Sequence, residues 1–172
     1  LDGTQTHKWV LEGLFGPSYK VTQTKDLMER GLLSNLDIQC LLLKHAPKKF
    51  ETYEDEIQYL IGHEKRNNFI SNLAIDLKGN TLILYSRVEA HGKVLYEMIN
   101  KNVTHGRKVF FIHGGVDAED RESVRKITEE ENNAIIVASY GTFSTGINIK
   151  NLHNVIFASP SKSRIRNLQS IG

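Results

Sequence analysis

Apolar and polar positions alternate in blocks from residue 79 onward, and these blocks predict an α/β fold. Runs of consecutive apolar residues, too short for helices, predict four strands: GNTLILYS (79–86), RKVFFIHGG (107–115), NNAIIVAS (132–139) and HNVIFASP (153–160). Segments with helical periodicity predict helices over 89–101, 117–130 and from 161 onward. Because such continuous apolar strands are buried on both sides, we expect a parallel sheet with helices on both faces.

The first 80 residues follow a less regular pattern. The spacing of apolar residues predicts helices within 4–17, 24–31 and 52–77, the last broken near Gly62, and strands over 19–22 and 37–44. The polar stretch 46–56 is predicted to be an exposed insertion or the start of a helix, with its acidic residues on a solvated face. Cys40 lies in an apolar run and is therefore predicted to be a core residue.

The residues that follow the four predicted strands are small or polar. These strand ends are Ser86-Arg87, His113-Gly114-Gly115, Ser139 to Gly146, and Ser159-Pro160-Ser161. In a parallel sheet all carboxyl ends lie at one edge, where such folds bind ligands. Hydroxyl and backbone N–H groups there suit a phosphate or a sugar, although the same composition also suits ordinary tight loops. Four consecutive ends of this kind predict a shared binding edge.

Length and composition limit how the chain can be organised. With 172 residues, 40% of them hydrophobic and 24% charged, it can form one domain with a full core, or one domain and a connector. No apolar stretch approaches the roughly 20 residues that a membrane span needs. The single cysteine can form no internal disulfide, which favours a reducing compartment, and we expect a cytoplasmic protein.

Charge is distributed unevenly along the chain. Residues 81–172 carry 12 Lys/Arg against 9 Asp/Glu. After Glu131 there is no acidic residue, whereas four basic residues follow: Lys150, Lys162, Arg164 and Arg166. Such a basic stretch suits a polyanion such as nucleic acid, with a merely solvated surface as the alternative.

Several common site motifs are absent from the sequence. It has no Walker A loop, G-x-x-x-x-G-K-[ST], and no G-x-G-x-x-G, so neither usual route to a bound nucleotide is present. The seven histidines include no i, i+4 pair and no nearby cysteine partner, so no metal site is expected. No G-x-S-x-G elbow occurs, which leaves a serine hydrolase without support.

Three segments of the chain resemble superfamily 2 helicases. NAIIVASYGTFSTGINIKNLHNVIFASPSKSRIRNLQSIG (133–172) resembles motifs V and VI, in which a strand ends in a hydroxyl residue, Gly-[ILV]-[DN]-[ILV] follows, and a helix begins with Gln-x-x-Gly. Upstream, TLILYSRVEAHGKVLYEMI (81–99) resembles motif IV, and VFFIHGGVDAEDRESV (109–124) resembles the strand, turn and helix that come next. Residues from about 81 to 172 thus resemble the second RecA-like motor domain, in particular that of the phage UvsW branch of DNA helicases.

The resemblance implies a RecA-like α/β fold without its own P-loop, in an ATP-dependent DNA helicase that remodels branched DNA in recombination, repair and replication. ATP and Mg²⁺ would be bound mainly by a preceding RecA-like domain of the same chain, which would be a partner of this one besides DNA. It places three residues at the ATP cleft: Gly146, Asn148 and Gln169. It places eight at the nucleic acid: Ser86, Arg87, His113, Gly114, Ser139, Tyr140, Gly141 and Thr142.

The resemblance also carries expectations about domain limits and activity. Residues 1–18 would be a connector from the preceding motor domain, and residues 19–172 the second RecA-like domain, ending within motif VI just before the family's arginine. Asn148 stands where many relatives have Asp, so a hydrogen bond is expected there in place of a charge. Residues 1–172 alone are expected to lack ATPase activity. The alternatives are an RNA helicase or restriction-type translocase motor, or a catalytically silent nucleic-acid-binding module.

Overall fold

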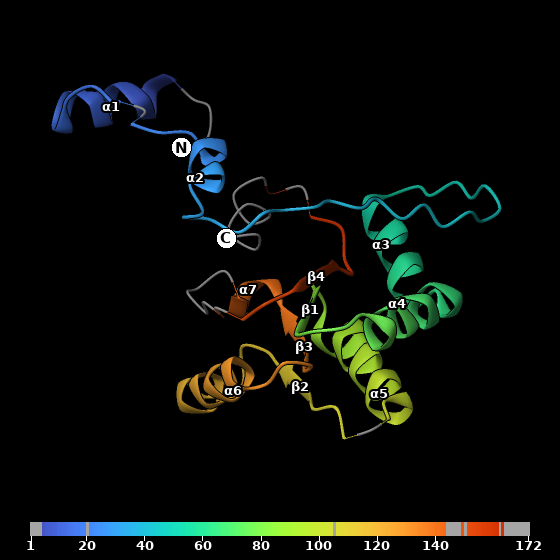
Figure 1. Cartoon of the computed structure of the whole chain (residues 1–172). Helices are drawn as coiled ribbons and strands as arrows, with labels where there is room; N and C mark the ends of the chain where they lie inside the picture. The colour runs from blue at the N-terminus through green and yellow to red at the C-terminus, as the bar shows by residue number, and fades with distance from the viewer. Residues whose placement is uncertain are drawn as a thin grey trace. The chain divides into compact units, whose positions relative to one another are not determined.

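The chain divides into two compact units, Leu1–Lys44 and His45–Gly172. The computed structural model describes residues 5–19, 21–104, 106–143, 149, 151–161 and 163, and Figure 1 labels their helices and strands. The boundary predicted between residues 18 and 19 lies within the first unit. Among the described residues, no helix is both long enough and apolar enough to cross a membrane.

The described residues of the first unit form two helices and irregular chain. Helices α1 (Gln5–Phe15) and α2 (Thr24–Glu29) confirm the first two predicted helices. The strands predicted over 19–22 and 37–44 are wrong for the residues described there, which have no regular structure. A strand needs a neighbour for its backbone hydrogen bonds, and the described part of this unit offers none. Cys40 is exposed, so its prediction as a core residue is wrong for the same reason.

Two helices near the start of the second unit confirm the helical region predicted to break near Gly62. Helix α3 (Tyr53–Gly62) is capped by Thr52, whose hydroxyl oxygen accepts the N–H of Asp55 at 3.1 Å. Helix α4 (Glu64–Asp76) is capped by His63, whose Nδ1 accepts the N–H of Arg66 at 3.1 Å. The break is therefore set by a polar cap between the helices. The acidic residues at the start of α3 are exposed, as predicted.

A four-stranded parallel sheet forms the centre of the second unit (Figure 1). Its strands are β1 (Thr81–Tyr85), β2 (Val109–Ile112), β3 (Ile135–Ser139) and β4 (Asn154–Phe157), in the order β2-β3-β1-β4. Strand β1 lies between β3 and β4, with Tyr85 opposite Ser139 and Leu84 opposite Phe157. All pairings are parallel, which confirms the predicted sheet.

Helical segments connect the strands. The π-helix η1 (Val88–Gly92) follows β1 and continues into α5 (Lys93–Asn102). Its wide turn is closed by the N–H of Gly92, which donates to the carbonyl of Arg87 at 2.9 Å. Helix α6 (Ala118–Glu130) joins β2 to β3, and the short helix α7 (Tyr140–Phe143) follows β3. Helices α5 and α6 confirm the two helices predicted between strands.

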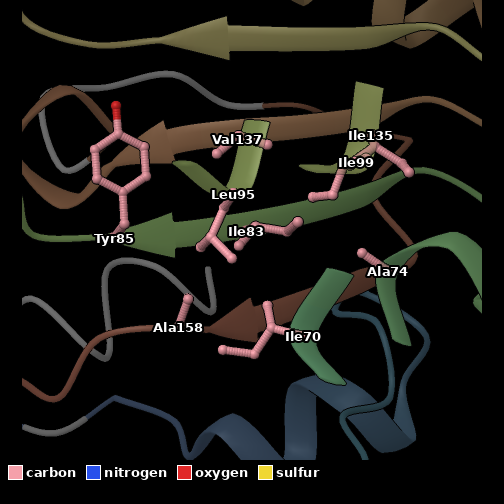
Figure 2. Packing of buried hydrophobic residues seen from close by; sticks show 9 residues of the cluster. All are labelled: Ile70, Ala74, Ile83, Tyr85, Leu95, Ile99, Ile135, Val137 and Ala158. Atoms are coloured by element: carbon pink, nitrogen blue, oxygen red, sulfur yellow. The ribbon is translucent and has the colours of Figure 1, made fainter. Parts of the chain in front are cut away.

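Alternate residues of the strands pack on opposite faces of the sheet. Figure 2 shows one face, where Ile83 and Tyr85 of β1 lie among buried side chains from α4 and α5. On the other face, Leu82 and Leu84 belong to a second cluster, which Val124 of α6 borders. The sheet is therefore covered on both faces, as its continuous apolar strands predict.

Asn80 closes the amino edge of the sheet with a fully buried side chain. Its amide nitrogen donates to the carbonyls of Thr128, Glu131 and Asn151 at 2.9, 2.7 and 2.7 Å. Its amide oxygen accepts the N–H of Ala134 at 2.8 Å. One side chain thus ties the start of β1 to α6, to the start of β3 and to the segment before β4, and leaves the opposite edge for the candidate site.

Candidate nucleic-acid interface at the carboxyl edge of the sheet

The predicted strand ends meet at the carboxyl edge. The N–H of Ser86, which follows β1, donates to the Oγ of Ser159, which follows β4, at 3.1 Å. Ser139 ends β3 opposite the last residue of β1. His113 follows the last residue of β2, which is paired with β3. The structure therefore confirms that these four ends share one edge of the sheet.

Ser159 joins three of the strand ends and is only 3% exposed. Its hydroxyl oxygen accepts the N–H of Ser86 and lies 3.0 Å from Nδ1 of His91 in η1. Its backbone carbonyl accepts the hydroxyl of Tyr140 at 2.7 Å. The turn after β4 is thereby bonded to the ends of both β1 and β3.

His91 is fully buried between Ser159 and Asn67. The Asn67 amide nitrogen donates to the carbonyl of Ile61 at 2.7 Å, and its amide oxygen lies 3.2 Å from His91 Nε2. An amide oxygen only accepts, so we assign the proton to Nε2, which leaves Nδ1 as the acceptor of the Ser159 hydroxyl. Burial and, secondly, the charge of Arg66 lower the pKa of His91 to about 4, so the imidazole is neutral.

Arg66 of α4 lies at the same edge. Its Nη2 donates to the carbonyl of Ala158 at 2.5 Å, and burial lowers the pKa of its guanidinium group. Together with Tyr140, Phe157 and Ser159, Arg66 contributes to the lining of a cavity of about 410 Å³. The guanidinium group of Arg66 therefore lies beside a cavity at the carboxyl edge.

At the end of β3, Ser139 caps helix α7. Its Oγ accepts the N–H of Thr142 at 3.3 Å and lies 2.7 Å from the Thr142 hydroxyl. Thr142 and Tyr140 are buried, and the ring of Tyr140 stacks on Phe157 with centroids 6.2 Å apart. Gly141 is exposed and Ser139 is partly exposed. Of the four residues predicted to contact nucleic acid here, two reach the surface and two lie beneath it.

Arg87, which precedes η1, is paired with a carboxylate. Its Nη2 donates to both oxygens of Glu54 in α3 at 2.9 Å. Gln58, one turn further along α3, donates to the same carboxylate at 2.8 Å and so holds its orientation. The Arg87 and Glu54 side chains are 51% and 54% exposed. The predicted contact residue Arg87 therefore lies at the surface with an anionic group already on it.

At the end of β2, His113 closes a tight turn. Its Nδ1 accepts the N–H of Gly115 at 3.1 Å, and its ring packs against Phe111 with centroids 5.2 Å apart. Gly114 at the tip is exposed, and a Cβ there would meet nothing within 4 Å. His113 thus orders the turn, while Gly114 leaves its backbone open to close approach.

The three residues predicted at the ATP cleft, Gly146, Asn148 and Gln169, lie outside the described residues. The basic residues 150, 162, 164 and 166 also lie outside them. Within the part of the chain that the structure describes, no group of three or more His, Cys, Asp or Glu could hold a metal ion.

Sequence reasoning missed Asn67, His91 and Glu54 as members of this edge. His91 meets Asn67 and Ser159 across 24 and 68 residues of sequence, a separation at which no local pattern signals contact. The sequence signal at His91 is its place in TLILYSRVEAHGKVLYEMI (81–99), the segment that resembles motif IV. Glu54 belongs to an acidic stretch whose residues are all exposed, so the sequence does not distinguish it from its neighbours.

Comparison with known proteins identifies the family of this chain. The model of the helicase conserved C-terminal domain matches residues 64–172. The chain belongs to this helicase family. The matched part of the helicase domain begins with α4 and includes all four strands and the carboxyl edge.

A protein sequence and a solved structure that resemble this chain are both of UvsW from phage T4. The ATP-dependent DNA helicase uvsW of Enterobacteria phage T4 is 39% identical over 168 residues, which are 93% of this chain and 33% of that protein. The crystal structure of T4 UvsW matches with a TM-score of 0.61 and 40% identity, over 72% of this chain and 25% of that one. These matches confirm the resemblance to superfamily 2 helicases near UvsW and the RecA-like fold. The chain spans about a third of the length of this relative.

Proposed function

We propose that this chain is the second motor domain of an ATP-dependent DNA helicase or translocase and holds the DNA backbone at the carboxyl edge. The family match supports the motor, and similarity to a DNA helicase supports DNA as its track. The observation that carries the DNA-binding part is that Ser86, Ser139 and Ser159, from three strands, meet at one edge. By similarity to uvsW, we propose branched DNA in recombination, repair and replication as the substrate.

The chemistry of this edge suits phosphate and does not suit base recognition. Arg87 offers a guanidinium group, which binds phosphate oxygens in a fork. Ser86 and Ser139 offer hydroxyl groups, and the exposed glycines Gly114 and Gly141 let a sugar-phosphate backbone approach closely. Contacts of this kind position a nucleic acid without specifying its sequence, as a motor that moves along DNA requires.

ATP and Mg²⁺ would be held mainly by a preceding RecA-like domain. The absence of a Walker A sequence from this chain supports that division, because such a loop is the usual route to a bound nucleoside triphosphate. We propose that Gly146, Asn148 and Gln169 face the cleft from this side. Because Gly146 is only five residues after Gly141 in the sequence, this segment would connect the nucleotide cleft to the DNA edge.

Arg87→Ala in the full-length protein tests the DNA edge, with binding to a forked DNA measured by fluorescence anisotropy over a series of salt concentrations. Loss of one phosphate contact should weaken binding by about tenfold and reduce the salt slope by about one. Lys101→Ala is the matched control, because Lys101 lies in the last turn of α5, at the other end of the helix from Arg87. Equal effects of the two variants would refute the assignment of this edge.

Nucleic-acid binding and ATP hydrolysis, measured together, separate two of the alternatives from a DNA motor. Preference for duplex RNA over forked DNA would favour an RNA helicase, and DNA binding without any DNA-stimulated ATP hydrolysis would favour a silent binding module. We expect purified residues 1–172 to bind DNA weakly and to hydrolyse no ATP. Substantial turnover by that fragment would contradict the division of the ATP site between two domains.

A further inference from the structure

We propose that His91 is a positioning residue for DNA binding, which acts by fixing the Ser159 hydroxyl group between the ends of β1 and β4. The inference rests on the proposed function, because it concerns the edge at which we place the DNA. His91 itself is fully buried and would touch no DNA. Its effect would pass through Ser159 to Ser86, a predicted contact residue.

The directions of the hydrogen bonds support this role. Asn67 presents an acceptor to His91, so the imidazole carries its proton on Nε2 and presents a lone pair to Ser159. The Ser159 hydroxyl group then donates to His91 Nδ1, with 3.0 Å between Oγ and Nδ1. A lone pair of the same Oγ accepts the N–H of Ser86, with 3.1 Å between N and Oγ. The imidazole thus selects one rotation of a hydroxyl group that would otherwise turn freely.

The position of Ser159 makes that rotation matter for the whole edge. Its carbonyl accepts the Tyr140 hydroxyl, and Tyr140 begins helix α7, which Ser139 caps. Movement of the turn after β4 would therefore displace the candidate contacts after β1 and after β3 together. The other partner of His91, Asn67, leads away from the edge, since its amide bonds the carbonyl of Ile61 in α3.

A buried histidine with a purely structural role would make the two hydrogen bonds of His91 equivalent. A pair of variants separates the cases. In His91→Asn, the amide oxygen replaces Nδ1 and can accept the Ser159 hydroxyl, while the bond to Asn67 is lost. In His91→Gln, the amide nitrogen replaces Nε2 and can donate to Asn67, while the bond to Ser159 is lost. Each variant leaves one buried group without its partner, so the two should lose similar thermal stability.

The experiment measures forked-DNA affinity and DNA-stimulated ATP hydrolysis of the full-length protein. We expect His91→Gln to raise the DNA concentration for half-maximal ATPase by about tenfold, the effect of one lost hydrogen bond, with kcat at saturating DNA changed less than twofold. His91→Asn should raise it by less than about twofold. Ser159→Ala should raise this DNA concentration as much as His91→Gln does. The double variant His91→Gln/Ser159→Ala should bind DNA no more weakly than Ser159→Ala alone.

Equal DNA affinities of His91→Asn and His91→Gln, at equal stability, would overturn the inference. Failure of the wild-type protein to bind DNA would instead overturn the proposed function. A measurement on the wild-type protein needs no variant to fold: the ¹⁵N NMR spectrum of the imidazoles should show His91 as the Nε2–H tautomer at neutral pH. The Nδ1–H tautomer, or a charged ring, would contradict the hydrogen-bond directions and with them the inference.

Discussion

Arg87 and Glu54 form a two-pronged ion pair in which one guanidinium nitrogen donates to both carboxylate oxygens at 2.9 Å. The carboxylate occupies the place that a backbone phosphate would take on Arg87. Because both side chains are about half exposed, the pair contributes little to stability and can exchange for another anion. Under the proposed function, Glu54 would therefore compete with DNA for Arg87, the cation predicted at the end of β1.

Replacing Glu54 by Gln should release Arg87 for phosphate. We expect Glu54→Gln to tighten binding to forked DNA by about two- to fivefold at moderate salt, the range set by an exposed ion pair. The slope of log Kd against log salt should steepen by about one. Anisotropy titrations at several salt concentrations measure both quantities.

Glu56→Gln controls for the loss of a negative charge from the same helix. Glu56 is also exposed on α3, and no hydrogen bond or ion pair links it to Arg87. It should tighten binding less than Glu54→Gln does. If both variants tighten binding equally, net charge alone accounts for the effect and the competition is refuted.

The free energy of unfolding should decrease as the pH is lowered, because His91 titrates at a lower pH in the fold than in the unfolded chain. Its pKa in the fold is about 4, below the ordinary value of 6.5, because burial and Arg66 both disfavour the charged ring. Below pH 6.5, His91 of the unfolded chain takes up a proton while His91 of the folded protein does not. The contribution of neutral His91 to stability is therefore fully present above pH 6.5 and is lost progressively between pH 6.5 and about pH 4. The loss should reach about 3 kcal/mol.

His91→Asn isolates this effect from the carboxylates that titrate over the same range. Its free energy of unfolding in urea should lie below that of the wild type at pH 7, and the gap should narrow toward pH 4. Parallel curves for the two proteins would show that His91 titrates normally in the fold.

Gly92 has no room for a side chain under Tyr85. A Cβ at Gly92 would lie 2.3 Å from the Tyr85 ring, which is fully buried and bonded through its hydroxyl to the carbonyl of Ile112. Gly92→Ala should therefore destabilise the domain by about 3 kcal/mol. Gly62→Ala is the matched control, since nothing lies within 4 Å of its Cβ position, and thermal melts should show it unchanged or slightly more stable.

Asn80→Ala should also destabilise the fold, by about 3 kcal/mol, because it removes the buried amide that bonds three carbonyls and one N–H at the amino edge. Asn102→Ala provides the comparison, as that side chain is exposed and bonds the carbonyl of Met98 in its own helix. It should change stability by less than about 0.5 kcal/mol. A similar small change for Asn80→Ala would mean that water replaces the amide at this edge.

The sheet could be predicted because its information is local. Each of the strands β1 to β4 is a continuous apolar run followed by small or polar residues, and this pattern predicts both the strand and the position of its carboxyl end. The segment 37–44 has a similar composition, but the strand predicted there is wrong, because a strand also depends on a neighbouring strand that no local pattern reveals. The helix break at His63 was found near Gly62, although the cap itself is a histidine ring that the usual capping rules do not name.

The candidate site was only half predictable. The strand ends follow from topology, so Ser86, His113, Ser139 and Ser159 could be placed at one edge from the sequence. The contacts behind them could not, since His91 and Glu54 reach their partners through tertiary packing. Tyr140 shows the limit most clearly: its place in the chain put it at the edge, but its burial depends on Phe157 and Ser159 of a later strand.

The π-helix η1 sets the rotation of helix α5 relative to strand β1. Its i, i+5 bonds from Gly92 to Arg87 and from Lys93 to Val88 give this turn a longer repeat than the α-helix that follows. Deleting one residue from it would restore an α-helical repeat and rotate α5 by about 100° relative to β1. The inward direction of His91 and the close approach of Gly92 to Tyr85 are thus encoded by the number of residues in this turn as much as by their identity.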